Sequence, residues 1–257
     1  MSLRYKMLAS TLLLGSAAPA MAGGFYLQEQ SARELGRAFS GEAASADNAS
    51  TVYYNPAGMT ELEGINFQLG GELLLVNSRQ ENRGTTRTVP GVPVSIPVPG
   101  GDGGNPFSQP IVVPQAYATA QITDRLWAGL GVSSPFGVVV DYDDDFFGRY
   151  DSLRSDVFTV NVQPSLAYKI NDNLSIGAGV DVQYIDVELT NALPNLNPAS
   201  GDGFLRVQGD DVSVGWNVGA QLEVEKVRLG AHYRSRMKHN LEGTFDLSGL
   251  VGPLAGQ

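Results

Sequence analysis

Apolar and polar positions alternate along much of this chain, most regularly between residues 212 and 224. Every even position of that segment is apolar and every odd position is small or polar, in the order Val-Ser-Val-Gly-Trp-Asn-Val-Gly-Ala-Gln-Leu-Glu-Val. Successive side chains of a β-strand point to opposite faces, so the segment would have one apolar and one polar face. The same alternation recurs over residues 157–170 and 174–184. It predicts long amphipathic strands.

Short and long connections alternate between the predicted strands. The short turns are centred on residues 124, 172 and 225. Bacterial outer-membrane barrels have this asymmetry, with short periplasmic turns and long extracellular loops. We therefore predict an all-β fold, an antiparallel transmembrane β-barrel. The expected strands are 64–77, 112–122, 126–140 with an interruption at 135–137, 157–170, 174–189, 211–224 and 227–246. The expected long loops are 79–110, 141–156 and 190–210.

The first residues, 1–22, have the composition of a secretory signal peptide. Arg4 and Lys6 precede a short apolar run, and Ala20-Met21-Ala22 is a small-x-small cleavage site. The apolar run is shorter than the roughly 20 residues that a membrane helix requires. We expect export and cleavage after Ala22, with an uncleaved N-terminal anchor as the alternative.

Residues 23–63 lack sustained alternation and are rich in Ala, Ser, Gly and Glu. Residues 31–39 predict a short helix closed by Gly41, and Asn-Pro-Ala-Gly at 55–58 predicts a turn or a helix start. We interpret this region as a small hatch, or plug, inside the barrel. Residues 64–257 would form the barrel wall.

The number of predicted strands indicates that the wall continues in further sequence. Bacterial single-chain barrels have an even number of strands, whereas about seven are expected here. Residues 252–257, Gly-Pro-Leu-Ala-Gly-Gln, are not strand-like. We therefore expect the chain to be the N-terminal portion of a longer barrel.

Composition excludes several classes of function. The formal net charge is −10, and an acidic chain is a poor candidate for binding nucleic acid, where basic side chains must neutralise phosphates. There is no cysteine, which excludes a disulfide scaffold, a thiolate metal site and a cysteine nucleophile.

The sequence carries no recognisable catalytic or metal-binding pattern. The two histidines, His232 and His239, have an odd spacing, which would place them on opposite faces of one strand and prevent a paired metal site. The acidic run 141–145 lacks the ligand spacing of a calcium loop and is interpreted as a solvated loop. No serine lies in a nucleophile elbow. We therefore predict a protein that is not an enzyme and has no cofactor or metal; a barrel lipase or protease is the enzymatic alternative.

Five short runs carry a family resemblance. They are Gly-Phe-Tyr-Leu-Gln-Glu at 24–29, Leu-Gly-Arg-Ala-Phe-Ser-Gly-Glu at 35–42, Asn-Pro-Ala at 55–57, Gly-Trp-Asn-Val-Gly at 215–219 and Tyr-Arg-Ser at 233–235. With them the chain resembles the FadL family of long-chain fatty-acid transporters, which includes the TodX-type hydrocarbon channels. The resemblance extends from about residue 23 to about residue 246.

The resemblance implies a fourteen-stranded barrel plugged by an N-terminal hatch. A hydrophobic ligand would lodge in a groove among the outer loops, move to an inner pocket, and leave sideways through the wall when the hatch shifts and the third strand kinks inward. In the hatch and inner pocket the implied residues are Phe25, Leu35, Asn55, Pro56 and Ala57, the last three lying against the kink. In the outer groove they are Leu193, Leu196, Phe204 and Leu205. At the kink they are Pro135, Phe136 and Gly137, or alternatively Gly129 or Gly131.

The expected function is passive transport of long-chain fatty acids or other hydrophobic compounds across the bacterial outer membrane, by a monomer surrounded by outer-membrane lipid. No cation of this sequence maps onto the family's carboxylate-binding position, so neutral hydrocarbons are equally consistent with it. The alternatives are an aromatic-hydrocarbon uptake channel and a structural or adhesive barrel. A general porin is least favoured, because residues 23–63 would plug it.

Overall fold

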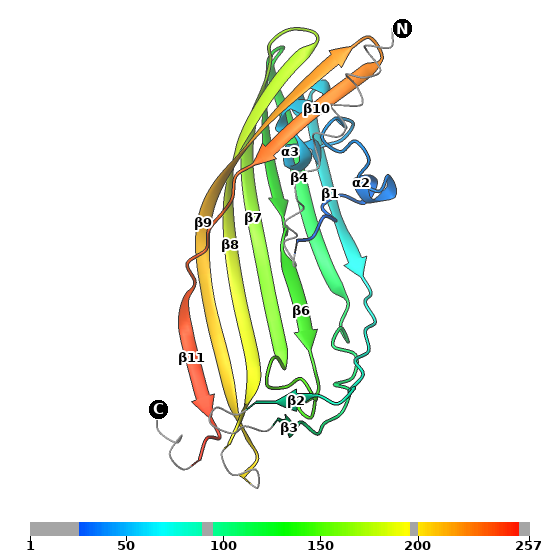
Figure 1. Cartoon of the computed structure of the whole chain (residues 1–257). Coiled ribbons are helices and arrows are strands. Elements are labelled where there is room, and N and C mark those ends of the chain that lie inside the picture. The colour runs from blue at the N-terminus through cyan, green and yellow to red at the C-terminus, as the bar shows by residue number, and fades with distance from the viewer. Residues whose placement is uncertain (1–25, 89–94, 196–199, 252–257) are drawn as a thin grey trace, which may run out of the picture.

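One long antiparallel sheet dominates the computed structural model, which describes residues 26–88, 95–195 and 200–251 (Figure 1). Two strands continue the line of another strand after a break: β6 follows β5 along β7, and β11 follows β10 along β9. The sheet therefore has seven strand positions, as predicted. In sheet order they are β1 (Ile65–Leu74), β4 (Ile111–Thr123), β5 (Leu126–Ser133) with β6 (Gly137–Asp141), β7 (Arg154–Lys169), β8 (Leu174–Pro194), β9 (Asp202–Val224), and β10 (Val227–Arg234) with β11 (Glu242–Ser248).

The sheet curls, and its two ends differ (Figure 1). The short turns after β4, β7 and β9 lie at one end, which we call the turn end. The longer connections lie at the other, which we call the loop end; there β2 (Thr86–Arg87) pairs with β3 (Ile96–Pro97). These contrasts confirm the predicted order of short and long connections.

The prediction of a long loop over 190–210 is wrong. The hairpin of β8 and β9 continues through it, with Thr190 opposite Arg206 and Pro194 opposite Asp202. Backbone hydrogen bonds between two strands do not need the apolar–polar alternation on which the prediction rested. Apolar–polar alternation appears only in the part of a strand whose two faces have different surroundings, one apolar and one polar.

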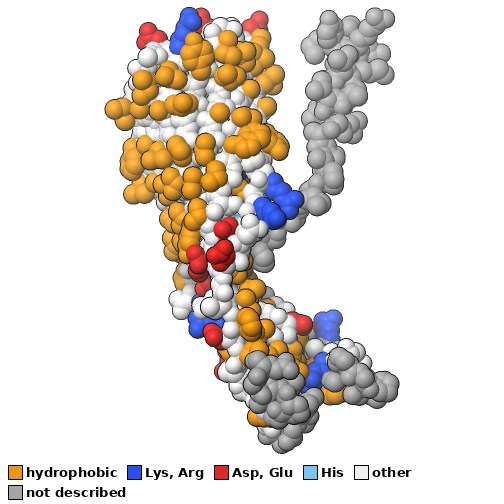
Figure 2. Space-filling model, turned by 90° about the vertical axis from the view of Figure 1, so that its left-hand side faces the viewer, with side chains coloured by type: hydrophobic (Ala, Val, Ile, Leu, Met, Phe, Trp, Pro, Cys, Tyr) orange, Lys and Arg blue, Asp and Glu red, His pale blue; other side chains and the backbone are white. Residues whose placement is uncertain are grey.

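Burial is the reverse of that in a soluble protein. On β7 the inward-facing Thr159 and Asn161 are 0% exposed, whereas Phe158 and Leu166 on the other face are 47% and 58% exposed. Figure 2 shows hydrophobic side chains gathered on the upper part of the outer face, with charged side chains at the rim above and again below. A barrel wall in lipid has this arrangement, apolar outward and polar inward. Among the described residues, no helix is long and apolar enough to cross a membrane.

The predicted seventh strand, 227–246, is in fact two strands with a break between them. Arg234 pairs with Asn217 and Glu242 pairs with Asp210, so eight steps on this strand oppose seven on β9. One extra residue is a bulge, which bends the strand and reverses which face the following side chains occupy.

Residues 26–64, here called the N-terminal segment, pack against the inner face of the sheet (Figure 1). They contain α2 (Ala32–Gly36), α3 (Thr51–Tyr54) and the 3-10 helix η1 (Pro56–Glu61). The predicted helix over 31–39 ends earlier, because Ala38 and Phe39 adopt left-handed backbone angles, with φ of 53° and 59°.

An apolar cluster joins the N-terminal segment to the wall. Its centre is Val52 and Met59, both 0% exposed. A Cβ atom at Gly129 of β5 would overlap Met59, so glycine there lets the segment approach the strand closely. The cluster consists of Ala49, Val52, Tyr53, Tyr54, Met59, Tyr117, Trp127 and Ala167.

Candidate functional site

The wall is interrupted between β5 and β6. Ser133 pairs with Asn161 and Gly137 pairs with Phe158, so four steps on this side oppose three on β7. The extra residue makes a bulge at Pro135 and Phe136, where a proline without an N–H is expected. The interruption in pairing falls at Pro135 and Phe136, directly before Gly137, whereas Gly129 and Gly131 lie in uninterrupted pairing.

The bulge opens a gap in the sheet. On the β4 side, pairing with β5 runs from Thr123 to Ala116 and no further. Residues 111–115 of β4 pair with β1, while β6 pairs with β7. Among the described strands, no backbone pairing joins β4 to β6. The strand positions of β4 and β6 therefore separate along the side of the sheet.

The start of the N-terminal segment closes this gap from inside. The backbone N–H of Leu27 donates to the carbonyl of Pro135 at 2.8 Å. The side chain of Gln30, 0% exposed, donates to the carbonyl of Ser134 at 2.8 Å and accepts from its N–H at 3.2 Å. The ring of Tyr26 contacts that of Phe136 edge-on, with 5.5 Å between centroids. Main-chain groups freed by the bulge thus find partners on the segment.

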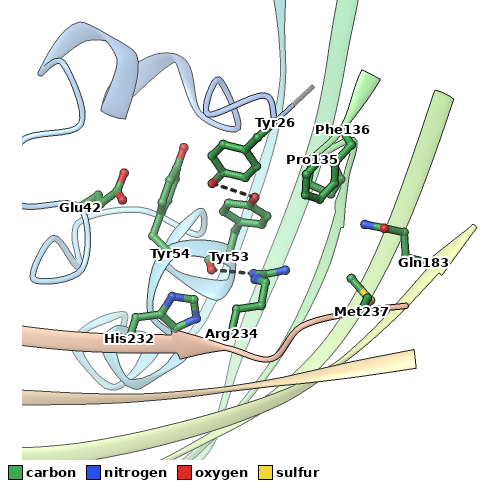
Figure 3. Close-up of a pocket in the computed structure, with 10 residues that line it drawn as sticks. All are labelled: Tyr26, Glu42, Tyr53, Tyr54, Pro135, Phe136, Gln183, His232, Arg234 and Met237. Carbon is green, nitrogen blue, oxygen red and sulfur yellow. Dashed lines mark hydrogen bonds between the residues drawn. The ribbon is translucent and has the colours of Figure 1, made fainter. Parts of the chain in front are cut away.

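Two adjoining cavities lie beside this contact. The first, of about 230 Å³, is drawn in Figure 3. The second, of about 410 Å³, shares Phe136, Gln183, Arg234 and Met237 with it. The two cavities therefore adjoin each other between the break and β10. The first is lined by Tyr26, Glu42, Tyr53, Tyr54, Pro135, Phe136, Gln183, His232, Arg234 and Met237.

Arg234 ties the N-terminal segment to the wall. Its Nη1 lies 2.6 Å from Oδ1 of Asp181 on β8. Its Nη2 donates to the carbonyl of Tyr53 and to Oε1 of Gln163, both at 3.0 Å. The guanidinium also lies 4.4 Å from the centre of the Tyr53 ring, a cation–π contact (Figure 3). Arg234 is therefore already bonded, and ligand binding to it would compete with these contacts.

Two tyrosines of the first cavity, Tyr53 and Tyr54, stay neutral. Burial raises the pKa of Tyr53 well above its ordinary range, and burial likewise raises the pKa of Tyr54. The hydroxyl oxygens of Tyr26 and Tyr53 are 3.5 Å apart. Tyr53 and Tyr54 therefore offer ring surface and hydroxyl groups without negative charge, an environment suited to an apolar or weakly polar ligand.

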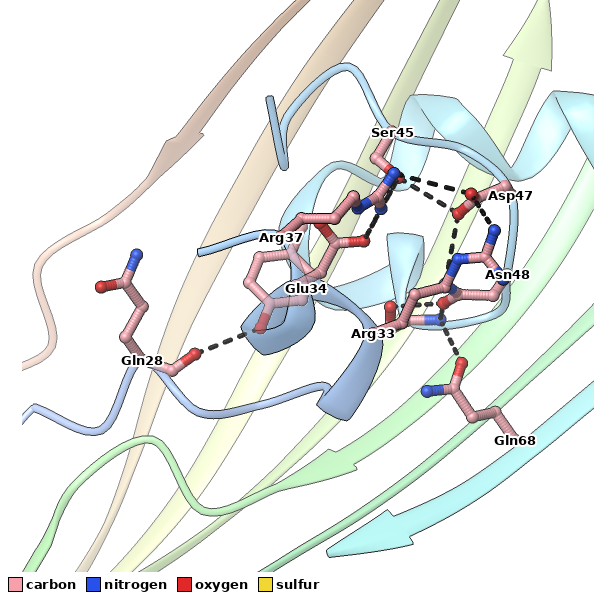
Figure 4. Close-up of polar contacts among 10 residues, drawn as sticks. Gln28, Arg33, Glu34, Arg37, Ser45, Asp47, Asn48 and Gln68 are labelled. Atoms are coloured by element: carbon pink, nitrogen blue, oxygen red, sulfur yellow. Dashed lines mark hydrogen bonds and ion pairs between the residues drawn. The ribbon is translucent and has the colours of Figure 1, made fainter. Parts of the chain in front are cut away.

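A polar cluster holds the outer side of the N-terminal segment (Figure 4). Arg33 forms an ion pair with Asp47 at 2.5 Å, and Arg37 forms one with the buried Glu34. Burial opposes the charge on Asp47, but Arg33 and Arg37 hold the pKa of this carboxyl below its usual range. The cluster joins the two ends of the loop between α2 and α3, so ion pairs within the N-terminal segment stabilise it.

The Asn-Pro-Ala run lies elsewhere than predicted. Asn55 donates from Nδ2 to the carbonyl of Ala220 on β9 at 3.0 Å, and a Cβ atom at Gly177 of β8 would lie 2.5 Å from the backbone nitrogen of Ala57. The prediction that Asn55, Pro56 and Ala57 contact the third-strand break is wrong, and none of the three lines either cavity. The helix η1 follows Asn55 directly and crosses to β8 and β9.

The other predicted residues are dispersed. Phe25 and Leu196 lie outside the described residues. Leu35 is 43% exposed on α2. The proposed outer groove does not form as one surface: Leu193 lies opposite Gly203 and Phe204 opposite Ala192, so Phe204 is on the other face of the hairpin from Leu193 and Leu205.

The histidine prediction also needs correction. His232 lines the first cavity and His239 the second, so both face the interior. His232 lies in the regular pairing of β10, whereas His239 lies in the break between β10 and β11. The extra residue in that break offsets the odd spacing of the two histidines. Within the described part of the chain, no group of three or more His, Asp or Glu side chains could hold a metal ion.

Sequence reasoning missed Tyr26, Gln30, Gln183 and Met237. One signal was available for Gln183, since it occupies a polar position in the alternation of β8. The others become recognisable only through contacts that join distant parts of the chain.

Two solved structures share the fold of this chain. A Pseudomonas aeruginosa FadL homologue superposes with a TM-score of 0.68 and 22% identity, covering 87% of this chain and 55% of that one. The toluene transporter TbuX of Ralstonia pickettii gives 0.59 and 20%, covering 80% and 57%. At these identities the similarity establishes the fold.

Sequence comparison establishes the family. Outer membrane protein P1 of Haemophilus influenzae is 34% identical over 187 residues, 71% of this chain and 40% of that protein. The long-chain fatty acid transport protein of Escherichia coli K12 is 26% identical over 256 residues, 88% and 54%. The chain thus spans about half the length of the relatives it matches. The family model of the outer membrane protein transport proteins (OMPP1/FadL/TodX) matches residues 13–256. These matches confirm the predicted resemblance, barrel fold and outer-membrane location: the chain belongs to the OMPP1/FadL/TodX family of outer membrane transport proteins.

Proposed function

We propose that this protein transports long-chain fatty acids or other hydrophobic compounds passively across the bacterial outer membrane. The observation that carries the proposal is the gap between β4 and β6, closed from inside by Tyr26, Leu27 and Gln30 beside a cavity lined largely by aromatic and apolar side chains. Relatives named as a long-chain fatty acid transport protein and a toluene transporter support the same class of cargo.

The cavity supplies the driving force for capture. A hydrocarbon gains about 0.8 kcal/mol for each CH₂ group that leaves water, so apolar walls are enough to hold a long chain. Release then requires the start of the N-terminal segment to leave Ser134 and Pro135. The gap beside Phe136 would let the ligand pass sideways into lipid without crossing a polar lumen.

Residues 23–63 act as the hatch in this proposal, residues 64–257 as part of the barrel wall, and residues 1–22 as a cleaved signal peptide. The N-terminal segment supports the hatch role, because its apolar cluster and the Arg234 contacts bind it to the inner face of the sheet. The protein works without a cofactor or a chemical reaction, as a monomer in outer-membrane lipid.

Aromatic hydrocarbons are the second candidate cargo. The first cavity is lined by four aromatic rings, those of Tyr26, Tyr53, Tyr54 and Phe136, which suit a small flat ligand as well as an alkyl chain. Uptake of oleate and of toluene, measured side by side, separates the two.

A reversible disulfide crosslink between positions 26 and 136 tests the proposal. Tyr26 and Phe136 form an antiparallel bridge, and such partners have Cα separations that a disulfide can span. Residues 1–257 contain no cysteine, so Tyr26→Cys with Phe136→Cys introduces the only pair within them. In a deletion strain carrying the full-length gene, we expect uptake to stop on oxidation and to return on reduction.

The matched control is Leu174→Cys with Leu222→Cys, which are paired across β8 and β9 away from the break. Its oxidation should leave uptake unchanged. Undiminished uptake of both oleate and toluene through the locked Tyr26–Phe136 variant would show that the break is not the exit.

A further inference from the structure

The break between β10 and β11 leaves a stretch of chain outside the ladder of β9. Pairing with β9 stops after Arg234 and resumes at Glu242. We call the intervening residues, 235–241, the β10–β11 crossing. Side-chain hydrogen bonds hold it in place of a strand ladder; the hydroxyl of Ser213, for example, donates to the carbonyl of Lys238 at 2.6 Å. The position of the crossing therefore depends on a few side chains.

One carboxylate, that of Asp211 on β9, holds the second half of the crossing. Its Oδ2 accepts from the backbone N–H of Asn240 at 3.1 Å and lies 3.0 Å from Nδ1 of His239. The other ring nitrogen of His239, Nε2, lies 3.0 Å from Oε1 of Gln183 on β8. The imidazole ring thus connects the crossing to two neighbouring strands of the wall.

Both nitrogens of this ring face an oxygen atom. A carboxylate oxygen and an amide oxygen only accept, so both contacts are hydrogen bonds when the ring is the imidazolium, which has two N–H groups. The neutral ring has one N–H, and its second nitrogen would turn a lone pair toward an oxygen. Turning the amide of Gln183 would supply a donor, but it would move Oε1 to the buried position where Nε2 now has no partner among the described residues. The neutral ring is therefore held less firmly than the charged one.

The charged groups around His239 come from three elements. Asp211 on β9 attracts the proton of the ring. Arg234 of β10 and Arg236 of the crossing line the same cavity and oppose that proton, although Asp181 of β8 pairs with Arg234. Histidine is the side chain that ordinarily changes charge between pH 5 and 8, whereas arginine stays charged throughout. The residues that β7 and the break contribute to the cavity carry no charge: Phe136, Val157 and Thr159.

We propose that His239 is a pH-sensitive latch, whose protonated ring holds the β10–β11 crossing to β8 and β9 and whose neutral ring releases it. The hold is thus present at acid pH and is lost as the pH rises. Its consequence rests on the proposed transport function. The crossing supplies Arg236, Met237 and His239 to the second cavity, which Phe136 of the break also lines. A released crossing leaves more room beside the exit, so uptake is faster at pH 8 than at pH 5.5.

The latch is tested first without any cargo. A nitroxide spin label is attached to Lys238→Cys, an exposed position next to His239, in purified full-length protein in which this cysteine is the only one. We expect a spectrum of restricted motion at pH 5 and of freer motion at pH 8. Adding His239→Gln, which cannot titrate, should make the spectrum independent of pH. Adding His232→Gln, the matched control on β10, should leave the change as it was.

Two results would remove the latch and leave the transport function untouched. One is a spectrum that does not change with pH while His239 is present. The other is a change that persists in His239→Gln or disappears in His232→Gln, because it would belong to another group. Heat-modifiable mobility on a gel confirms that each variant is folded.

The effect on transport is measured with toluene, which is neutral at every pH. In a deletion strain carrying the full-length gene, we expect faster uptake at pH 8 than at pH 5.5, and the same ratio for His232→Gln. The difference should be lost in His239→Gln. Equal uptake at both pH values through the wild-type protein would overturn the control of uptake by the latch. Absence of toluene and oleate uptake at both pH values would overturn the transport function itself, while the spectra would still decide the latch.

Discussion

Nη1 of Arg234 lies 2.6 Å from Oδ1 of Asp181, whose side chain has no exposed surface. The same carboxylate accepts hydrogen bonds from Asn161 at 2.9 Å and from Asn217 at 2.7 Å. Three strands therefore converge on one carboxylate, and the arginine it holds reaches the backbone of Tyr53. The anion on β8 sets the position of a cation on β10, and that cation fixes the N-terminal segment.

Replacing Asp181 by Asn should loosen the N-terminal segment. It leaves the Arg234 charge without its buried partner, and breaking such a pair costs about 3–5 kcal/mol. We expect a lower unfolding temperature of the purified protein and faster proteolysis within residues 26–64. Asp186→Asn, an exposed carboxylate on the same strand with no ion pair among the described residues, is the control. An unchanged unfolding temperature would mean that Arg234 finds an equivalent partner.

Gln30→Ala should open the closed gap. The substitution leaves both the N–H and the carbonyl of Ser134 without the partners they have now, at about 1–3 kcal/mol for each unsatisfied group. We expect brief, larger openings in single-channel recordings across planar bilayers. Gln109→Ala, at an exposed position of the long connection, should behave as wild type. Recordings in which the two variants match would contradict the sealing role of Gln30.

Gly219→Ala should prevent the Asn-Pro-Ala run from docking. A Cβ atom there would overlap Oδ1 of Asn55, which also accepts from the N–H of Ala57 at 3.1 Å. We expect loss of heat-modifiable mobility and weak assembly into the outer membrane. The control is Gly71→Ala on β1, where a Cβ atom has no neighbour closer than 3.6 Å. Normal assembly of both would show that the loop holding Asn55 shifts easily.

Stability should fall as pH rises through the titration of Glu42. Burial raises the pKa of this carboxyl, and the nearby Glu34 raises it further, against a hydrogen bond from Gln28 that lowers it. The folded state therefore binds this proton more tightly than the unfolded state, so its contribution is present at acid pH and is lost above the ordinary value of about 4.3.

The variant Glu42→Gln should remove that dependence and stabilise the N-terminal segment at neutral pH. Unfolding midpoints in urea at pH 5 and pH 8 measure it. The control is Glu63→Gln, at an exposed position two residues before the start of β1. A wild-type pH dependence that persists in Glu42→Gln would assign it to another group.

Alternation along the chain determined which side chains face inward, because a strand's two faces are set by local geometry alone. The prediction for residues 157–170 matches β7, with Thr159 and Asn161 inward and Phe158 outward. The short turns, the absence of cysteine and the interruption at Pro135 could also be recognised from the sequence. These features depend on neighbours in sequence, so the sequence by itself was sufficient for them.

Only the tertiary structure decided what fills the barrel and where it opens. A bulge is defined by the partner strand, so the extra residue between Arg234 and Glu242 could not be read from one segment. The contact of Gln30 with Ser134 joins residues 104 apart, and that of Arg234 with Tyr53 joins residues 181 apart. Such contacts exist because the sheet curls and brings its inner face around the N-terminal segment. Side-chain packing across that interior, which no local pattern encodes, fixes the position of the plug, the gap and the cavities.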